Sequence, residues 1–399
     1  MRVLQIHNYY RFRGGEDNMF EHVCGMLRDH GHDVLTFERR SDSIEGAVGK
    51  VRASLSGIYS PASKAAVVEL IHRERPQLAH VHNLYPLISP SAMAACRSAG
   101  IPVVMRCPNY RLVCPTGIHL REGKPCDLCN GGREYWCAIT NCRGNWVESA
   151  AMAARSAIVR WSRLILDTVA MFVPPSECVK QRLMAAGIPL ERIRVVPNTV
   201  PLPDAAADAS RGTYIGLAAR LSEEKGVNTL IEAARLLPGI PFKIAGEGPL
   251  LEPLRKSAPA NVEFLGQIGK QELAQFYARS RVCVVPSVWM EAFGLVAAEA
   301  MAHGIPVIAT RMGALPEIVD DARTGYLFNP GDAGALARHI ETLWESPGQC
   351  RAMGMEGREK VRREYVREVY YARIMGVYEH VLNGGKPTRV PAPAAARIA

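Results

Sequence analysis

The sequence predicts an α/β protein with two doubly wound domains, and three observations support this. The 399 residues exceed what one typical core accommodates and suit two domains. Short, continuous apolar runs alternate with helix-like segments, which is the pattern of buried parallel strands. A Pro- and Ala-rich linker over residues 198–211 interrupts this alternation, which then starts again. We therefore expect two domains that face each other across a ligand-binding cleft.

The N-terminal domain is expected to span residues 1–197. Its first strand-like run, "RVLQIHN", leads into a loop with Gly14 and Gly15, a helix over about 17–30 and a second run, "DVLTFE". Four more runs rich in Val, Ile and Leu follow: "QLAHVHN", "IPVVMRC", "VAMFVPPS" and "RIRVVPN".

The C-terminal domain is expected over residues 212–365. Its strand-like runs are "TYIGLAARL", "PFKIAGEG", "VEFLGQI", "VCVVPSV" and "IPVIAT", each separated from the next by a helix-like segment. A long helical segment over about 347–382 follows, and residues 384–399, rich in Pro and Ala, are expected to be disordered.

The composition and charge of the sequence indicate which binding partners and which cellular location to expect. A formal net charge of +9 favours an anionic partner, such as nucleotide phosphates or a membrane surface. Because Lys and Arg form no consecutive block and do not interleave with aromatic residues, we expect no nucleic-acid partner. The sequence contains no run of 18 apolar residues and no signal-peptide pattern, so we expect a cytoplasmic protein.

Two acidic residues stand out in "SVWMEAFGLVAAEAMAHGIPVIAT", residues 287–310. Glu291 follows a strand, and Glu299 lies about five residues into a helix that begins near Phe293, roughly 7–8 Å along the axis. The free amides at the helix start attract phosphate. Carboxylates on both sides of an anion site suit an elongated ligand with hydroxyl groups at both ends, such as a nucleotide sugar. The alternative is two ordinary helix acids.

Two cations flank a predicted strand-to-helix turn in "GLAARLSEEKGVNTLIEAARLL". Arg220 follows the strand and Lys225 precedes the helix, where they would neutralise a diphosphate. Ordinary surface cations are the alternative.

Gly14 and Gly15 would let the backbone approach a phosphate, and the alternative there is a tight turn.

These motifs closely resemble the signatures of family 4 glycosyltransferases, which are retaining enzymes with the GT-B fold of two Rossmann-like domains. The resemblance implies that Glu291 contacts hydroxyl groups of the donor sugar and Glu299 those of the ribose. It also implies that Arg220 and Lys225 stabilise the departing nucleoside diphosphate. In such enzymes a last helix, here residues 366–383, crosses back to the N-terminal domain.

The resemblance implies further donor contacts. They come from the glycine-rich loop, from the amides after Glu291, and from strand ends that frame the base in "AGEGPL" and "FLGQI". The residues concerned are Gly14, Gly15, Phe293, Gly294, Leu295, Gly246 and Leu265.

The sequence departs from the family pattern on the acceptor side. Many relatives carry a His after the fourth strand, whereas "RCPNYRLVCPTG" has Pro108 there. The remaining acceptor-side candidates are His82, Asn83, Arg106 and Asn109, although a His at a strand end is usually structural.

Six of the eleven cysteines lie in an insert over residues 107–142. Cys126 and Cys129 have the C-x2-C spacing of a zinc knuckle, and Cys114 and Cys142 could complete a structural zinc site, with Cys137 as a substitute. Free thiols and a disulfide are the alternatives. The insert resembles those of a bacterial subset of family 4.

The segment "AAMAARSAIVRWSRLILDTVAMF", residues 150–172, combines Arg155, Arg160, Trp161 and Arg163 with apolar residues. Such a helix can lie in the headgroup region of a membrane, which would make the protein peripheral on the inner face of the cell membrane. The alternative is an ordinary domain helix.

The resemblance implies a glycosyltransferase of bacterial polysaccharide or cell-surface glycan synthesis. It would move a sugar, with retention, from a UDP- or GDP-sugar to a hydroxyl group of a glycan or lipid-linked glycan. No catalytic metal is expected, because the chain has no Asp-x-Asp motif. A non-catalytic homologue that acts as a binding partner, a sugar-nucleotide epimerase and a phosphorylase remain alternatives. A dinucleotide-dependent oxidoreductase is disfavoured, because no G-x-G-x-x-G follows the first strand.

Overall fold

A computed structural model describes residues 1–10, 14–41 and 56–384. The chain divides into two compact units. Unit 1 contains residues 1–118, 127–197 and 368–399, and unit 2 contains residues 119–126 and 198–367. Part of the cysteine-rich insert is therefore grouped with unit 2. Within the described ranges, no helix has both the length and the apolar character needed to cross a membrane.

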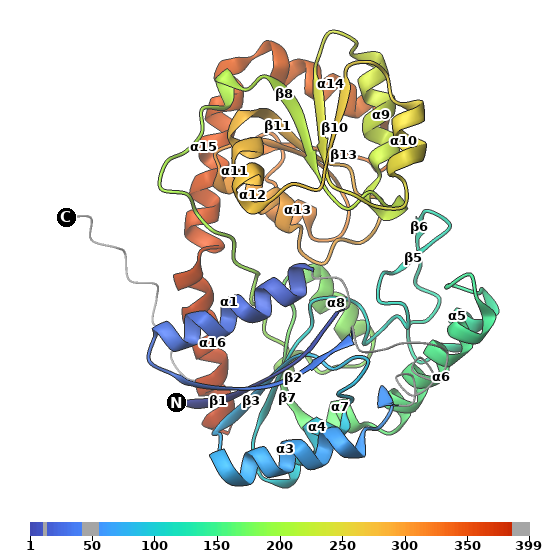
Figure 1. The fold of residues 1–399 in the computed structure, drawn as a ribbon, viewed down its shortest axis with the longest axis vertical. Helices are drawn as coiled ribbons and strands as arrows, with labels where there is room; N and C mark the ends of the chain where they lie inside the picture. The colour runs from blue at the N-terminus through green and yellow to red at the C-terminus, as the bar shows by residue number, and fades with distance from the viewer. Residues whose placement is uncertain (11–13, 42–55, 385–399) are drawn as a thin grey trace. The chain divides into compact units, whose positions relative to one another are not determined.

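Unit 1 contains a parallel sheet of five strands in the order β2-β1-β3-β4-β7 (Figure 1). Five of the six predicted runs form these strands. Strands β1, β3, β4 and β7 are buried along almost their whole length, whereas the edge strand β2 is mostly half-buried or exposed. The strands are β1 (Arg2–Tyr9), β2 (Asp33–Arg40), β3 (Leu78–Asn83), β4 (Val103–Arg106) and β7 (Val169–Val173).

The prediction of a strand at "RIRVVPN" is wrong. Only Ile193 makes an isolated bridge, to Phe172 of β7. The segment runs beside β7, which is followed directly by Pro174 and Pro175. The amides of Arg194 and Val196 still donate to the carbonyls of Phe172 and Pro174, both at 3.0 Å. Because Pro174 and Pro175 have no backbone N–H to donate in return, a full ladder does not form.

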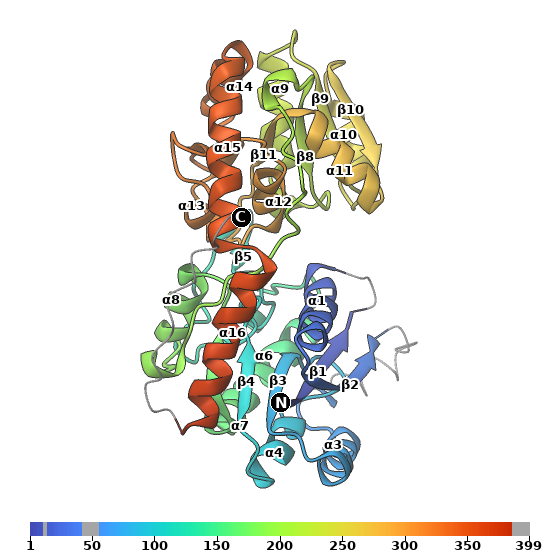
Figure 2. The same cartoon turned by 90° about the vertical axis from the view of Figure 1, so that its left-hand side faces the viewer.

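Helices cover both faces of the unit 1 sheet. On one face, α1 and α16 contribute Met26, Leu27, Ile374 and Val377 to a buried cluster with strand residues such as Val104. On the other face lie α3 and α4 (Figures 1 and 2). The helices and short strands of this unit and of the insert are α1 (Gly15–Asp29), α3 (Pro61–Glu74), α4 (Ser91–Ser98), β5 (Leu120–Arg121), β6 (Lys124–Pro125), α5 (Tyr135–Ile139), α6 (Trp146–Trp161), α7 (Leu164–Thr168) and α8 (Glu177–Ala185).

Unit 2 contains a parallel sheet of six strands in the order β10-β9-β8-β11-β12-β13. All five predicted runs form strands here. Strand β13 was not predicted, because only three apolar residues stand there between Gly325 and Asn329. The strands are β8 (Tyr214–Ala218), β9 (Phe242–Ala245), β10 (Val262–Gly266), β11 (Ser280–Val285), β12 (Val307–Thr310) and β13 (Gly325–Phe328). The helices are α9 (Val227–Leu236), α10 (Leu251–Ser257), α11 (Lys270–Arg279), α12 (Leu295–Ala302), α13 (Leu315–Ile318) and α14 (Ala333–Glu345).

The long C-terminal helical segment is two helices instead of one. Helix α15 (Pro347–Glu364) belongs to unit 2, and α16 (Arg367–Leu382) packs into the core of unit 1. Between them, the carbonyl of Tyr365 accepts a hydrogen bond from the amide of Val200 at 2.9 Å. Residues 385–399, most of the predicted disordered tail, lie outside the described residues.

The two strand orders locate the ligand-binding edges. In unit 2, numbering its strands from one, the order is 3-2-1-4-5-6, so the chain leaves the adjacent strands β8 and β11 in opposite directions. In unit 1 the order is 2-1-3-4-5, and the same reversal lies between β1 and β3. Ligands of doubly wound sheets bind at the carboxyl ends of the strands at such a point.

Candidate functional site

Lys225 and Glu291 form an ion pair at the reversal point of unit 2. Lys225 lies in the turn after β8, and Glu291 lies in the loop after β11. The Nζ atom of Lys225 is 2.7 Å from Oε1 of Glu291, and the same oxygen accepts a hydrogen bond from the Ser287 hydroxyl at 2.7 Å. Two of the three predicted catalytic residues are thus brought into direct contact.

The ion pair keeps the Glu291 side chain charged and restricts the position of the Lys225 ammonium. Burial would raise the pKa of Glu291, but the charge of Lys225 and the hydrogen bonds from Lys225 and Ser287 outweigh burial and lower that pKa. Glu291 is therefore a carboxylate at neutral pH. The ammonium of Lys225 also lies 5.0 Å from the centre of the Trp289 ring, a cation–π contact that restricts its position.

Gly226 allows the two loops of this pair to meet. Its φ is 65°, in the left-handed region, and an added Cβ would lie 2.0 Å from the carbonyl oxygen of Pro286. Beside it, the amide of Val288 donates to the carbonyl of Glu224 at 3.0 Å. The close backbone approach sets Lys225 against Glu291.

Gly226→Ala is expected to lower the free energy of unfolding by more than the roughly 1–2 kcal/mol that a left-handed backbone alone costs a non-glycine residue. The clash with Pro286 adds to this cost, and the shifted loops should also lower activity. Urea unfolding measures the effect. Gly239→Ala, where a Cβ meets no atom within 4 Å, is the matched control. Equal stability of the two variants would contradict this role.

The second predicted acid, Glu299, lies in the middle of α12. Gly294 precedes the helix with φ of 99°, and Glu299 is its fifth residue. Burial raises the pKa of Glu299, and the hydroxyl of Tyr277, which donates to its Oε2 at 3.1 Å, partly offsets this. The side chain thus keeps one carboxylate oxygen without a protein donor among the described residues.

Arg220, the third predicted catalytic residue, is exposed and lies two residues beyond β8. Among the described residues its guanidinium has no ion-pair partner. It lies at the same carboxyl edge of the sheet as Lys225 and Glu291, because β8 and β11 are neighbours. An unpaired guanidinium at this edge can bind a phosphate bidentately.

The other donor-side residues lie along the same edge or beside it. Gly246 follows β9 with φ of 137°, and its amide donates to the carbonyl of Gly266 at 2.7 Å, next to Leu265 of β10. Phe293 is buried against the Tyr365 ring, with centroids 5.4 Å apart, so only its backbone is available to a ligand. Leu295 is the first residue of α12.

Sequence reasoning missed several contacts of this site. Ser287 and Trp289 stand in the quoted stretch between β11 and Glu291, so their place in a loop at the strand end was a usable signal. Tyr277 comes from α11, and no local pattern connects it with Glu299.

In unit 1, Gly14 caps α1 and Gly15 is its first residue. The amide of Gly14 donates to Asp17 at 3.1 Å, and Asp17 also contacts Nε2 of His7 at 2.8 Å, with both side chains fully buried. Neither His7 nor Asp17 was predicted as a site residue. Their pairing fixes the start of α1 against the end of β1.

The acceptor-side candidates have internal partners. Nε2 of His82 lies 2.7 Å from Oε1 of Gln5, and the Asn83 side chain donates to the carbonyl of Asn8 at 2.7 Å. Arg106 is also buried, and Asn109 donates to Glu16 at 2.8 Å. Burial lowers the pKa of His82 well below its ordinary value, so it is a neutral, packed imidazole. An acceptor role for these four residues stays a prediction.

The cysteine insert was predicted to supply four thiolates to a structural zinc, those of Cys114, Cys126, Cys129 and Cys142. Cys126 is grouped with unit 2, whereas Cys114, Cys129 and Cys142 belong to unit 1. In the part of the chain that the structure describes, no three His, Cys, Asp or Glu side chains are placed to hold a metal ion. Burial, followed by the neighbouring thiol of Cys142, raises the pKa of Cys137 to about 12. Zinc binding by the insert stays a prediction.

Comparisons with known proteins show the family of this chain. Residues 205–360 match the family of glycosyl transferases group 1, and residues 14–199 match the glycosyl transferase 4-like domain. The sulfoquinovosyl transferase of Arabidopsis thaliana is 35% identical over 373 residues, which span 89% of this chain and 68% of that protein. The glycogen synthase of Mycobacterium tuberculosis is 26% identical over 307 residues, which span 73% of this chain and 66% of that protein.

Solved structures share the fold. Sucrose-phosphate synthase from Thermosynechococcus elongatus superposes with a TM-score of 0.72 at 21% identity, covering 96% of this chain and 99% of that chain. The Anabaena protein HepE in complex with UDP gives 0.68 at 18% identity, covering 95% and 100%. The fold and the site define a glycosyltransferase of the GT-B class. The chain belongs to the group 1 glycosyltransferases, with an N-terminal domain of the glycosyl transferase 4 type.

Proposed function

We propose that this enzyme transfers a sugar from a nucleoside diphosphate sugar to a hydroxyl group with retention of anomeric configuration. The observation that carries this proposal is the Lys225–Glu291 pair beside an unpaired Arg220 at the carboxyl edge of β8 and β11. Cations there suit a diphosphate, and a fixed carboxylate suits sugar hydroxyls. HepE was solved with UDP-glucose, which supports the same donor class.

The proposed reaction needs no nucleophile from the protein. The bond between C1 of the sugar and the diphosphate oxygen breaks, and the nucleoside diphosphate leaves with the electron pair. Arg220, Lys225 and the amides at the start of α12 stabilise that growing negative charge, which is an electrostatic task. The acceptor hydroxyl then attacks C1 from the same face, and its proton passes to an oxygen of the departing phosphate.

The two acids have separate tasks in this proposal. Glu291, held as a carboxylate by Lys225 and Ser287, accepts hydrogen bonds from hydroxyl groups of the donor sugar. Glu299, whose Oε2 atom is occupied by Tyr277, offers its other oxygen to the ribose hydroxyls. We also propose a glycan or lipid-linked glycan as acceptor and a role in glycan synthesis at the cell surface.

Arg220→Ala is expected to weaken nucleoside diphosphate binding about tenfold or more, because hydrogen bonds to charged groups contribute about 1.5–3 kcal/mol. A thermal-shift screen against UDP-, GDP- and ADP-sugars first finds the donor, and calorimetry then measures its Kd for each variant. Arg211→Ala, on an exposed side chain of unit 2, is the matched control. If no donor raises Tm in the unmodified protein, the proposed donor class is wrong.

A further inference from the structure

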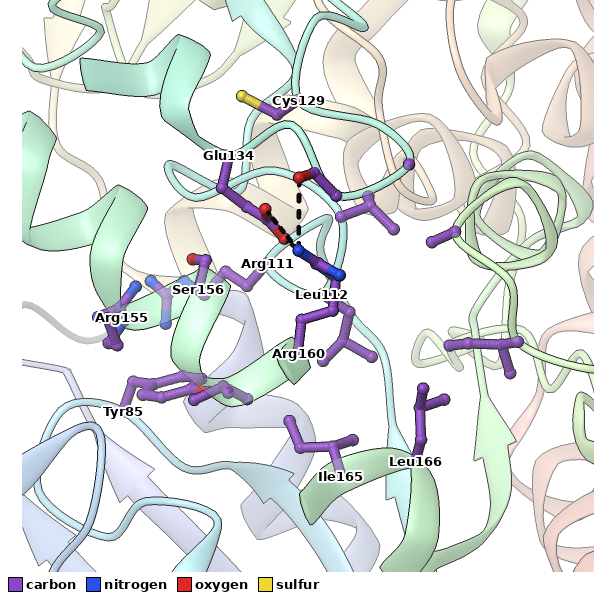
Figure 3. A pocket seen from close by; sticks show the side chains of 16 residues that line it. Tyr85, Arg111, Leu112, Cys129, Glu134, Arg155, Ser156, Arg160, Ile165 and Leu166 are labelled. Carbon is purple, nitrogen blue, oxygen red and sulfur yellow. Dashed lines mark hydrogen bonds and ion pairs between the residues drawn. The ribbon is translucent and has the colours of Figure 1, made fainter. Parts of the chain in front are cut away.

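Unit 1 contains a cavity that the proposed donor chemistry does not use (Figure 3). Tyr85 follows β3 and Arg111 follows β4, whereas Ile165 and Leu166 lie in α7, directly before β7. The cavity therefore extends from the carboxyl ends of β3 and β4 toward the start of β7. In Figure 3, Tyr85 and Arg155 lie on one side of the space and Ile165 and Leu166 on another. The cavity thus combines cationic and apolar walls. Its apolar residues are Leu112, Val113, Val159, Ile165, Leu166 and Ile188.

The three arginines of the cavity differ in their partners. Arg160 is paired with Glu134 at 2.6 Å. Among the described residues, neither Arg111 nor Arg155 contacts a carboxylate. Each guanidinium instead lies over a tyrosine ring, Arg155 at 4.6 Å from the centre of Tyr85 and Arg111 at 5.1 Å from the centre of Tyr10. Two cations in one cavity therefore lack an anionic partner.

The environment of Arg155 favours a bound anion. Burial lowers the pKa of this guanidinium, and the nearby charge of Arg111 acts in the same direction. An anion between the two side chains would offset both effects. A phosphate ester or a diphosphate carries about two negative charges and enough oxygen atoms for both guanidiniums, whereas a carboxylate carries one charge.

Helix α6, which carries Arg155 into the cavity, also exposes an apolar face. Trp146, Val147, Ile158 and Trp161 are 61%, 78%, 43% and 84% exposed. At 3.6 residues per turn they share one side of the helix with three exposed alanines, Ala150, Ala151 and Ala154. Exposed apolar faces of this kind, with Trp and Arg, are typical of helices that lie in the headgroup region of a membrane.

We propose that this cavity binds the phosphate group of a lipid-carried acceptor, with Arg111 and Arg155 on the phosphate and the apolar wall on the first carbons of the lipid. The exposed face of α6 then lies against the bilayer that holds this acceptor. This inference rests on the proposed transfer function, because it names the acceptor class.

Calorimetry with the full chain tests the proposal, using farnesyl diphosphate, inorganic pyrophosphate and farnesol as probes. We expect farnesyl diphosphate to bind, and Arg111→Met and Arg155→Met each to weaken that binding at least about tenfold. Arg155→Lys, which keeps a charge, should recover part of it. Arg163→Met, on a side chain that is 65% exposed, is the matched control and should bind as the unmodified protein does.

Each contrary outcome is informative. If pyrophosphate binds as tightly as farnesyl diphosphate, the site takes a free anion, and the lipid part is overturned. If Arg111→Met and Arg155→Met both bind normally, the cavity is not the site. Should Arg155→Met fail to fold, the half-buried Arg111 still carries the test. These probes bind without a donor sugar. A protein that binds no donor in the thermal-shift screen could therefore still bind farnesyl diphosphate, and the two proposals can fail separately.

Discussion

Lys225→Ala and Glu291→Ala are each expected to reduce kcat/KM at least about tenfold, because each removes a charged contact to the donor that contributes roughly 1.5–3 kcal/mol or more. The two residues contact each other at 2.7 Å, so each also positions the other. Steady-state transfer assays with the donor identified by the thermal-shift screen measure the loss.

Stability must be measured alongside, because Lys225→Ala leaves the buried Glu291 carboxylate without its cation. Removal of one partner from such a pair costs more than removal of both. The double variant Lys225→Met, Glu291→Gln should therefore be more stable than Lys225→Met alone and still inactive, which separates folding from catalysis. Lys243→Ala, from a surface pair with Glu263 at 2.8 Å, is the matched control. Full activity in both single alanine variants would show that the site assignment is wrong.

Acidification from pH 7 to pH 5 is expected to lower the free energy of unfolding of unit 1 by about 2 kcal/mol through His80, with a further loss in the same direction through His82. Burial lowers the pKa of His80 to about 3 and that of His82 well below its ordinary value. The unfolded chain therefore takes up protons below about pH 6.5 while the folded chain does not. The stability is present above that pH and is lost as the pH falls, by about 1.4 kcal/mol per pH unit for each group.

Urea unfolding at several pH values between 5 and 7 measures this slope. His80→Gln and His82→Gln should each reduce the slope of the free energy of unfolding against pH by the contribution of one titrating group. This reduction is expected whatever the variant does to absolute stability. His72→Gln, on the exposed side of α3, is the matched control. An unchanged slope in the double variant His80→Gln, His82→Gln would exclude these two histidines as the cause.

Most of the fold follows from local pattern. The apolar runs predicted ten of the eleven strands in the two large sheets, because most of these parallel strands are buried on both faces and therefore apolar throughout; the edge strands β2 and β10 are more exposed. The two segments for which the prediction failed each have a physical explanation. In β13 only three apolar residues, Tyr326, Leu327 and Phe328, stand between Gly325 and Asn329. The segment "RIRVVPN" has the composition of a strand, but the prolines beside it have no N–H with which to complete a ladder.

The site was predictable where one motif carries it. Glu291 and Lys225 were expected at adjacent strand ends, and the structure joins them. Contacts between distant segments were not predictable, since Tyr277 meets Glu299, and His7 meets Asp17, only through the packing of a helix on another element. The same limit applies to Arg111 and Arg155, which lie 44 positions apart in the sequence and share one cavity.

The last helix has a consequence for how the chain folds during synthesis. Tyr370, Ile374, Val377 and Tyr378 fill the core of unit 1, although they are translated after all of unit 2. Until these residues leave the ribosome, the part of the first sheet that α16 covers stays exposed to solvent, although α1 already packs on the same face. Unit 1, most of which is synthesised first, therefore completes its core last. A fragment ending near Pro197 would expose apolar core residues to solvent and would be prone to aggregate.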